Sequence, residues 1–339
     1  MLDPVVGQPA LADPTTAALH VARRSLDRRK VGPLIGVLVA VFGAWYVSRT
    51  LDSALLFGLF LLLAAVNLGV ACYALRARQL SLRAVGLLGE RSWIPVDVEV
   101  LRGTTGITDV LADGAALRVL SLTAAHRAVL RRTGRAWVVG PTADGVAALR
   151  VEGSHEAWPA RVLPTAPARR PAPSTDVVEP TLRAAEVRAR RAKALLFFPA
   201  VLVVYAVYVA TLFGGFQWYL FIAGMSGPLM ALVLVVLFRH RLPDRRLPAL
   251  VRAGDWVRAE VTVHSRTPRR DATAAASATL RLPDGATVAV VAGNAHLDLL
   301  GTITETGAVW VAGTVALGRT VALGFPGYPQ VAAAKVTGS

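Results

Sequence analysis

The feature that most constrains this chain of 339 residues is an internal repeat. Asp13-Pro14-Thr15 is matched by Glu179-Pro180-Thr181, and each motif is followed by a pair of alanines, a valine and a pair of arginines. The prolines predict helix starts, which Asp13 or Thr15 can cap in the first copy and Thr181 in the second. An apolar segment then follows in both copies. We therefore expect two copies of one unit, produced by duplication and fusion.

Further motifs extend the repeat toward the C-terminus. The pairs are Trp93 with Trp256, Leu117-Arg118-Val119 with Leu280-Arg281-Leu282, Trp137 with Trp310, and Trp158-Pro159 with Tyr328-Pro329. Because the tryptophans recur, core packing is favoured for them over a ligand cage. The repeat predicts that residues 86–163 and 249–337 share one β fold, with Trp93 equivalent to Trp256 and Trp137 to Trp310.

Each copy contains two apolar runs that lack charged side chains. The four runs are Val31–Val47, Ala54–Leu75, Ala194–Phe213 and Trp218–Phe238. Each is about as long as a helix that crosses a hydrocarbon layer of roughly 30 Å. The links within each pair are short, so each pair is expected to form an antiparallel hairpin. A hydrophobic content of 54% and a mean hydropathy of +0.50 agree with a membrane protein.

Basic residues gather at the outer ends of these runs, whereas the turns contain Arg49 alone. The positive-inside rule then places both termini and both polar segments in the cytoplasm. The predicted location is the plasma membrane, with multiple passes and cytoplasmic N and C termini.

The polar segments have the pattern of strands. Ile94, Val96 and Val98 alternate with polar residues, and the same alternation recurs from Val257 onward. Pro283-Asp284-Gly285 predicts a hairpin turn. A small sandwich or a closed barrel is expected for each segment, because closure removes exposed strand edges.

The predicted fold class is therefore a membrane α+β protein with four transmembrane helices in two hairpins and two duplicated, small cytoplasmic β-barrel or β-sandwich domains. The predicted segments are an N-terminal tail and basic amphipathic helix (1–30), a first transmembrane hairpin (31–78), a first β domain (86–163), a Pro/Ala/Arg linker (164–180), a basic helix (181–193), a second transmembrane hairpin (194–238) and a second β domain (249–337).

In general plan, a transmembrane hairpin followed by a small barrel resembles the NfeD-like membrane proteins, with a Gly/Val pattern over residues 103–153 and 301–324. The resemblance implies a barrel of the OB type. It transfers no function.

No catalytic, cofactor or metal site is predicted. The histidines, none of them at the spacing of metal ligands, are His20, His126, His155, His240, His264 and His296. Asp97 and Glu99 share one strand face, but Glu260 and Thr262 stand there in the second copy, so a solvated face is favoured over an acid/base pair. Cys72 is the single cysteine, which excludes an intramolecular disulfide.

The net charge of +15 comes mainly from arginines that flank the apolar runs. Contact with lipid headgroups is the hypothesis for Arg23, Arg24, Arg28, Arg29, Lys30, Arg188, Arg190, Arg191, Lys193, Arg239 and Arg241. Nucleic acid is not expected as a partner, because aromatic residues are not interleaved with these basic residues. The expected partners are anionic membrane lipid and another membrane or cytoplasmic protein.

The predicted function is a non-enzymatic integral membrane scaffold or accessory subunit, which presents two cytoplasmic β domains for binding a protein partner at the inner leaflet. The alternative is a component of a transporter or channel for lipid or cell-envelope material. The apolar runs contain no ionisable side chain, which disfavours transport by this chain alone. A membrane-bound enzyme is the third possibility, and it would need a site that no sequence motif indicates.

Overall fold

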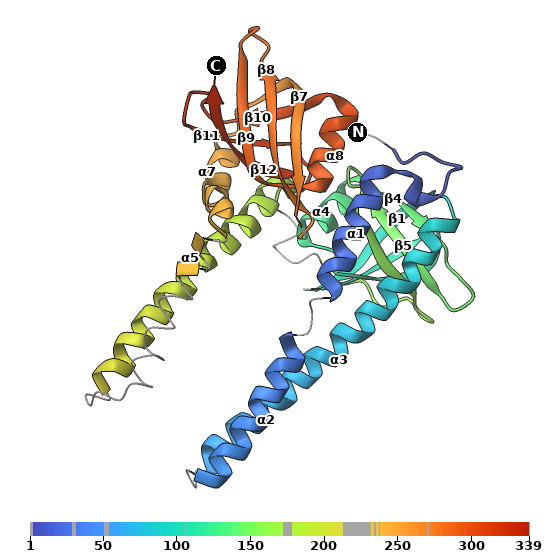
Figure 1. Ribbon diagram of the computed structural model, residues 1–339. Coiled ribbons are helices and arrows are strands. Elements are labelled where there is room, and N and C mark those ends of the chain that lie inside the picture. Colours follow the sequence, from blue (N-terminus) through green and yellow to red (C-terminus); the bar gives the residue numbers. More distant parts are fainter. Residues whose placement is uncertain are drawn as a thin grey trace.

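The computed structural model describes residues 3–28, 32–50, 54–104, 106–171, 178–212, 232–233, 235–236, 238–269 and 271–338. It consists of two closed β-barrels and long helices that extend from them (Figure 1). The helices outside the barrels are the 3-10 helix η1 (Ala10–Ala12), α1 (Pro14–Arg28), α2 (Gly32–Thr50), α3 (Ala54–Glu90), α5 (Pro180–Leu212), the 3-10 helix η3 (Arg239–Arg246) and α7 (Leu247–Ala253).

Barrel 1 has six antiparallel strands in the order β1-β2-β3-β6-β5-β4, and β4 closes it on β1. Its elements are β1 (Ile94–Gly103), β2 (Ile107–Ala112), β3 (Ala115–Leu120), helix α4 (Ala124–Thr133), β4 (Arg135–Val139), β5 (Val146–Val151) and β6 (Ala157–Val162). A two-residue turn, Asp113-Gly114, joins β2 to β3 with both residues at positive φ, as tight hairpins require.

Barrel 2 has the same topology, with the order β7-β8-β9-β12-β11-β10 and closure of β10 on β7. Its elements are β7 (Trp256–Pro268), β8 (Thr273–Arg281), β9 (Thr287–His296), helix α8 (Leu297–Thr306), β10 (Ala308–Ala312), β11 (Thr320–Gly324) and β12 (Val331–Gly338). The predicted turn at Pro283-Asp284-Gly285 joins β8 to β9, which confirms that hairpin. The shared strand order confirms that both polar segments have one β fold.

The strand register confirms the predicted equivalence of the tryptophans. Trp137 pairs with Pro95 in barrel 1, and Trp310 pairs with Arg258 in barrel 2. An independent anchor is the C-cap glycine of each barrel helix, since the Gly134 carbonyl accepts from the Val98 N–H and the Gly307 carbonyl from the Val261 N–H. Trp137 and Trp310 each stand three residues after that glycine, and Trp93 and Trp256 each stand five residues before that valine, so both pairs are equivalent.

The same register shows that two motif pairs were matched wrongly. Trp158 lies opposite Leu149 in barrel 1, and the equivalent position in barrel 2 is Ala332, opposite Leu323, rather than Tyr328. Leu117-Arg118-Val119 lies on β3, whereas Leu280-Arg281-Leu282 begins on β8, the counterpart of β2. Strands share a period of two, so short alternating motifs match each other at many offsets.

The prediction of four membrane-spanning helices is wrong. Among the described residues, one helix, Phe57–Glu90 within α3, is long and apolar enough to cross a membrane. The run Trp218–Phe238 lies largely outside the described residues, as does the last residue of the run before it, Phe213. The four-span fold class, the multi-pass plasma-membrane location and the placement of both termini in the cytoplasm are not supported. The prediction rested on the hydropathy and length of four runs, and among the described residues only the run on α3 lies in a helix that meets both criteria.

The barrels are the part of the predicted fold class that the structure contains. Each has six strands, whereas the resemblance to NfeD-like proteins implied an OB-type barrel, which has five.

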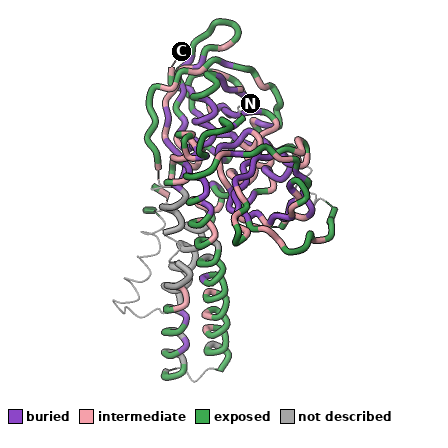
Figure 2. Tube along the Cα trace, turned by 90° about the vertical axis from the view of Figure 1, so that its right-hand side faces the viewer, coloured by how far each residue is buried: buried purple, intermediate pink, exposed green. Residues whose placement is uncertain are grey.

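The helices α2 and α3 lie side by side as an arm that extends away from barrel 1 (Figures 1 and 2). Small residues make the close contact, since Ala40 and Ala44 are buried and the Asn67 side chain fills the space beside Gly36. Most large apolar side chains of α3 along this arm are exposed, with Leu55 reaching 79%.

The helix that precedes each barrel also packs against the barrel strands. At the end of α3, Ala84 and Leu87 pack in one core with Trp137 and Val139 of barrel 1. In barrel 2, Leu247 of α7 packs with Ala312, the position equivalent to Val139. Each barrel is therefore attached to the helix before it through the same part of the sheet.

Candidate functional site

The two barrels meet through equivalent loops, β5–β6 (residues 152–156) and β11–β12 (residues 325–330). The Tyr328 hydroxyl donates a hydrogen bond to Glu152 Oε1 at 3.0 Å, and the Gln330 side-chain amide donates to the Gly153 carbonyl. Gly153 and Gly327 stand at the same loop position and share a positive φ of 73° and 81°. The contact therefore joins two equivalent loops, as a two-fold interface does.

Each loop also contacts the helix of the opposite barrel. On one side, Asp298 of α8 accepts hydrogen bonds from Ser154 Oγ at 2.7 Å and from the His155 backbone N–H at 2.6 Å. On the other side, the Arg132 guanidinium of α4 lies 4.9 Å from the centre of the Tyr328 ring. We call these contacts the α8 half and the α4 half of the joint.

Each long helix also bonds to the loop of the barrel that follows it, through residues that are not equivalent in the two copies. Thr16 of α1 donates through Oγ1 to the His155 carbonyl at 2.9 Å, and Thr181 of α5 donates to the Phe325 carbonyl at 3.2 Å. The helix α1 also packs on barrel 2, where Leu19 belongs to the barrel core. Its contact with α8 is so close that a Cβ at Gly301 would lie 2.2 Å from Thr15 Cγ2.

A pocket of about 420 Å³ opens beside the α8 half. Its lining includes the N-terminal segment before α1, Trp93 and the polar side chains of Asp13, Arg150, His155 and Glu305. Barrel 1 contributes Arg150 and His155, barrel 2 contributes Glu305, and Asp13 precedes α1. The pocket is therefore a product of the joint, and neither barrel forms it alone.

Asp13 is the centre of the hydrogen bonds in this pocket. Its Oδ1 accepts from the Thr15 N–H at 2.9 Å, so it caps α1 as the sequence predicted. Its Oδ2 lies 2.7 Å from Thr16 Oγ1, whose one hydrogen is shared between this carboxylate and the His155 carbonyl. Its Oδ2 also lies 3.2 Å from Arg150 Nη1 and 2.9 Å from His155 Nδ1. In the second copy the prediction of Thr181 as the cap is wrong: Glu179 accepts from the Leu182 N–H at 2.7 Å, whereas the Thr181 hydroxyl donates to the Phe325 carbonyl.

Three carboxylates line the pocket, those of Asp3, Asp13 and Glu305, together with the guanidinium of Arg150. Asp298 lies next to it and accepts the His155 backbone N–H. Burial alone would raise the pKa of Asp13, but its hydrogen bonds with His155 and Thr16 lower it. Burial likewise opposes ionisation of Asp298, whereas the nearby His155 and His296 and the bonds from His155 and Ser154 lower its pKa. Burial raises the pKa of Glu305 and lowers that of Arg150.

The arginines proposed for lipid contact lie on three helical elements. Arg23, Arg24 and Arg28 lie on α1, Arg188, Arg190, Arg191 and Lys193 on α5, and Arg239 and Arg241 on η3, while Arg29 and Lys30 fall outside the described residues. Arg188 pairs with Asp244 at 3.0 Å, and Arg241 pairs with Asp271. Desolvation and the neighbouring Arg241 and Arg188 lower the pKa of Arg191. Part of this set therefore serves to fix η3 against α5 and barrel 2.

Sequence reasoning missed the pocket because its members are far apart along the chain. The histidine spacing indicated no ligand, and a solvated or interfacial position was expected for His155, but its side chain is 4% exposed and lies between the barrels. Among the pocket residues, only Asp13 belongs to a motif that the sequence analysis recognised. That motif predicted a helix start and gave no indication that Asp13 contacts His155 or Arg150. Asp97 and Glu99 are exposed, as a solvated face requires.

Comparisons with protein families, with curated proteins and with solved structures found no match to this chain.

Proposed function

We propose that this protein is a non-enzymatic scaffold that presents its two barrels, held as one unit, to a protein partner. The observation that carries the proposal is the joint itself. Asp298 is 3% exposed and connects barrel 2 to the loop of barrel 1 through two short hydrogen bonds. Breaking such a buried contact leaves unsatisfied polar groups, each at a cost of about 1–3 kcal/mol. This favours a fixed arrangement of the two barrels.

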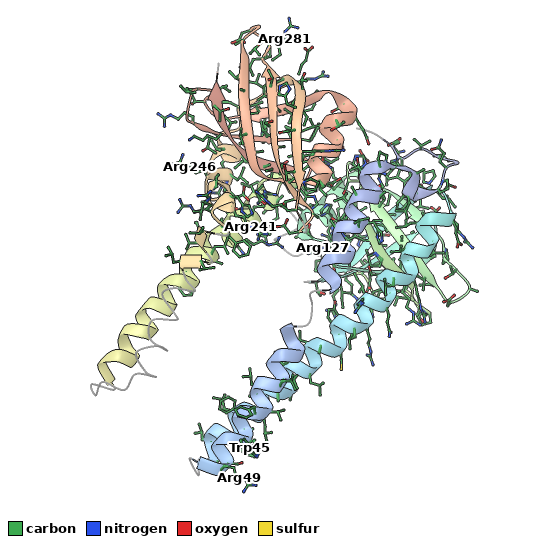
Figure 3. The ribbon with its side chains drawn as sticks, viewed as in Figure 1. Trp45, Arg49, Arg127, Arg241, Arg246 and Arg281 are labelled. Atoms are coloured by element: carbon green, nitrogen blue, oxygen red, sulfur yellow. The ribbon has the colours of Figure 1, made fainter. Side chains whose placement is uncertain are left out.

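The partner is proposed to have an acidic surface. Exposed arginines, Arg239, Arg245 and Arg246, lie on one short segment, η3, beside barrel 2. Figure 3 shows Arg246 pointing away from the body of the protein, whereas Arg241 of the same segment turns toward it. Complementary charge of this kind contributes mainly to the association rate and to the choice of partner.

The test is quantitative capture of partners by cross-linking in the native cell, followed by binding measurements with the purified partner. The variant R239Q/R245Q/R246Q should bind about tenfold more weakly, because exposed charges contribute fractions of a kcal/mol each. The matched control R258Q/R281Q/R319Q removes three exposed arginines from barrel 2 and should bind as the wild type does.

Two results would contradict the proposal. The first is equal loss of binding in both triple variants, which would indicate a general effect of charge and no defined surface. The second is a single alanine substitution of an exposed polar residue that abolishes the cellular function while fold and partner binding persist, which would indicate catalysis. Sedimentation with anionic vesicles in place of the partner would show whether lipid is the acidic surface instead.

A further inference from the structure

The pocket places two groups with lone pairs opposite each other. His155 Nδ1 lies 2.9 Å from Asp13 Oδ2 and 3.4 Å from Arg150 Nη2. A carboxylate cannot donate a hydrogen bond and the contact with it is the shorter one, so the hydrogen belongs to Nδ1 and the approach of Arg150 is not a hydrogen bond to the ring. In the neutral ring, Nε2 then carries a lone pair. This atom lies 3.6 Å from Glu305 Oε2, which is beyond hydrogen-bond distance.

The spacing between these two atoms is that of metal ligands. Nitrogen and oxygen ligands lie about 2.0–2.2 Å from Zn²⁺, so two of them at a tetrahedral angle are about 3.4 Å apart. The arrangement behind the ring also fits, because a ligating histidine commonly donates its other N–H to a carboxylate. Ligand atoms of Asp13, His155 and Glu305 all lie within 4.8 Å of one another.

Charge and an unused donor give independent support. Asp13, Glu305 and the adjacent Asp298 outnumber the one guanidinium, that of Arg150, so the pocket favours an added cation. Trp93 lines the same pocket and is 1% exposed, and its indole N–H has no acceptor among the described residues.

We propose that the pocket binds one divalent metal ion of the zinc class, with His155 Nε2 and the Glu305 carboxylate as ligands and Asp13 orienting the imidazole. Water completes the coordination on the side of the pocket. Because His155 belongs to barrel 1 and Glu305 to barrel 2, the ion would cross-link the barrels. This inference goes beyond the proposed scaffold function and does not depend on it.

The test is titration of the full chain, freed of metal with a chelator, with Zn²⁺ and with Co²⁺. We expect one equivalent to bind, the thermal midpoint to rise with Zn²⁺ concentration, and the visible absorption of Co²⁺ to change on binding. His155→Gln and Glu305→Gln should each weaken binding by at least about tenfold and remove the spectral change. Asp13→Asn keeps an oxygen for the cap and should weaken binding about 10–100-fold, as loss of an orienting partner does.

The control is His264→Gln, which changes an exposed histidine on β7 and should bind as the wild type does. Far-UV circular dichroism in chelator establishes that each variant is folded. The proposal is overturned if folded wild type binds no Zn²⁺ at millimolar concentration, the result expected if a proton alone bridges His155 and Glu305. Binding that persists unchanged in both ligand variants would overturn it as well. Partner capture is measured separately, in the presence of chelator. Absence of metal binding would therefore overturn the metal proposal and would not affect the scaffold proposal.

Discussion

The two halves of the inter-barrel joint are built on equivalent positions but use different chemistry. Register and loop length make Arg132 equivalent to Glu305, and Ser154 equivalent to Tyr328. The α8 half relies on a buried carboxylate that receives two hydrogen bonds, whereas the α4 half relies on an aromatic ring beneath a guanidinium. The two copies thus share one geometry, while one half of the joint contains a buried carboxylate beside a polar pocket and the other a cation–π contact with a phenol hydrogen bond.

The largest expected difference between the halves is in stability. Asp298→Ala leaves the Ser154 hydroxyl and the His155 N–H without their acceptor inside the joint, so we expect a loss of about 3 kcal/mol in the free energy of unfolding. The measurement is urea unfolding at neutral pH in chelator. Asp284→Ala, an exposed turn aspartate in the same barrel, is the control and should lose less than about 1 kcal/mol. Equal losses would show that the joint contributes nothing particular.

A smaller loss is expected where α1 crosses α8. Gly301→Ala would place a methyl group 2.2 Å from Thr15 Cγ2, and a β-branched neighbour cannot move aside easily. We expect about 2 kcal/mol of destabilisation from overpacking, despite the better helix propensity of alanine. The equivalent residue in α4 is already Ala128. Ala128→Gly should cost only about 1 kcal/mol, and a stabilising Gly301→Ala would contradict the close crossing.

The halves should also respond to opposite ends of the pH range. The pKa of Asp298 is lowered on folding, so its stabilising effect is complete above the unfolded pKa, near 4, and is lost as the pH falls through the folded pKa. The wild type should therefore lose stability more steeply than Asp298→Asn below pH 4. Unfolding midpoints in urea at pH 7, 5, 4 and 3 measure this, and parallel curves would refute it.

In the α4 half the sign is reversed. Burial and the hydrogen bond to Glu152 raise the pKa of Tyr328, so folding favours the neutral phenol. Its contribution is complete below the unfolded pKa, near 10, and declines as the pH rises above that value. Tyr328→Phe should remove this alkaline sensitivity. Urea midpoints between pH 8 and 11 provide the measurement, and an unchanged alkaline slope would be inconsistent with it.

The smallest effect is expected from Tyr328→Phe at neutral pH. The ring beneath Arg132 is retained, and only the hydroxyl that bonds Glu152 is lost. A partly buried hydrogen bond of this kind contributes about 1 kcal/mol. Arg132→Gln is the companion variant for the cation–π contact and should cost a similar or smaller amount. Urea unfolding measures both, and a loss as large as that of Asp298→Ala would erase the contrast between the halves.

Local sequence patterns predicted correctly those features that depend on interactions between neighbouring residues. The cap at Asp13, the Pro283-Asp284-Gly285 turn and the alternation along β1 depend on neighbouring residues, and each is present in the structure. The apolar runs misled because hydropathy reports composition and does not report what a helix packs against. Nor did the runs indicate where the helix packs, since α3 continues beyond the predicted end at Leu75 and buries Leu87 and Leu88 against barrel 1.

By itself, the sequence determined that the chain is a duplication, that each copy contains a small β domain of one fold, and that its paired tryptophans are equivalent. These conclusions rest on repeated motifs and on the alternation of side chains along a strand. Both are visible in neighbouring residues and do not depend on how the chain packs. Only the tertiary structure decided how the two copies meet. Asp13, His155 and Glu305 are separated by more than a hundred residues each, and their encounter depends on the closure of two barrels and the crossing of α1 over α8. No local pattern encodes such a contact, because its energy comes from burial that exists only after both barrels have folded.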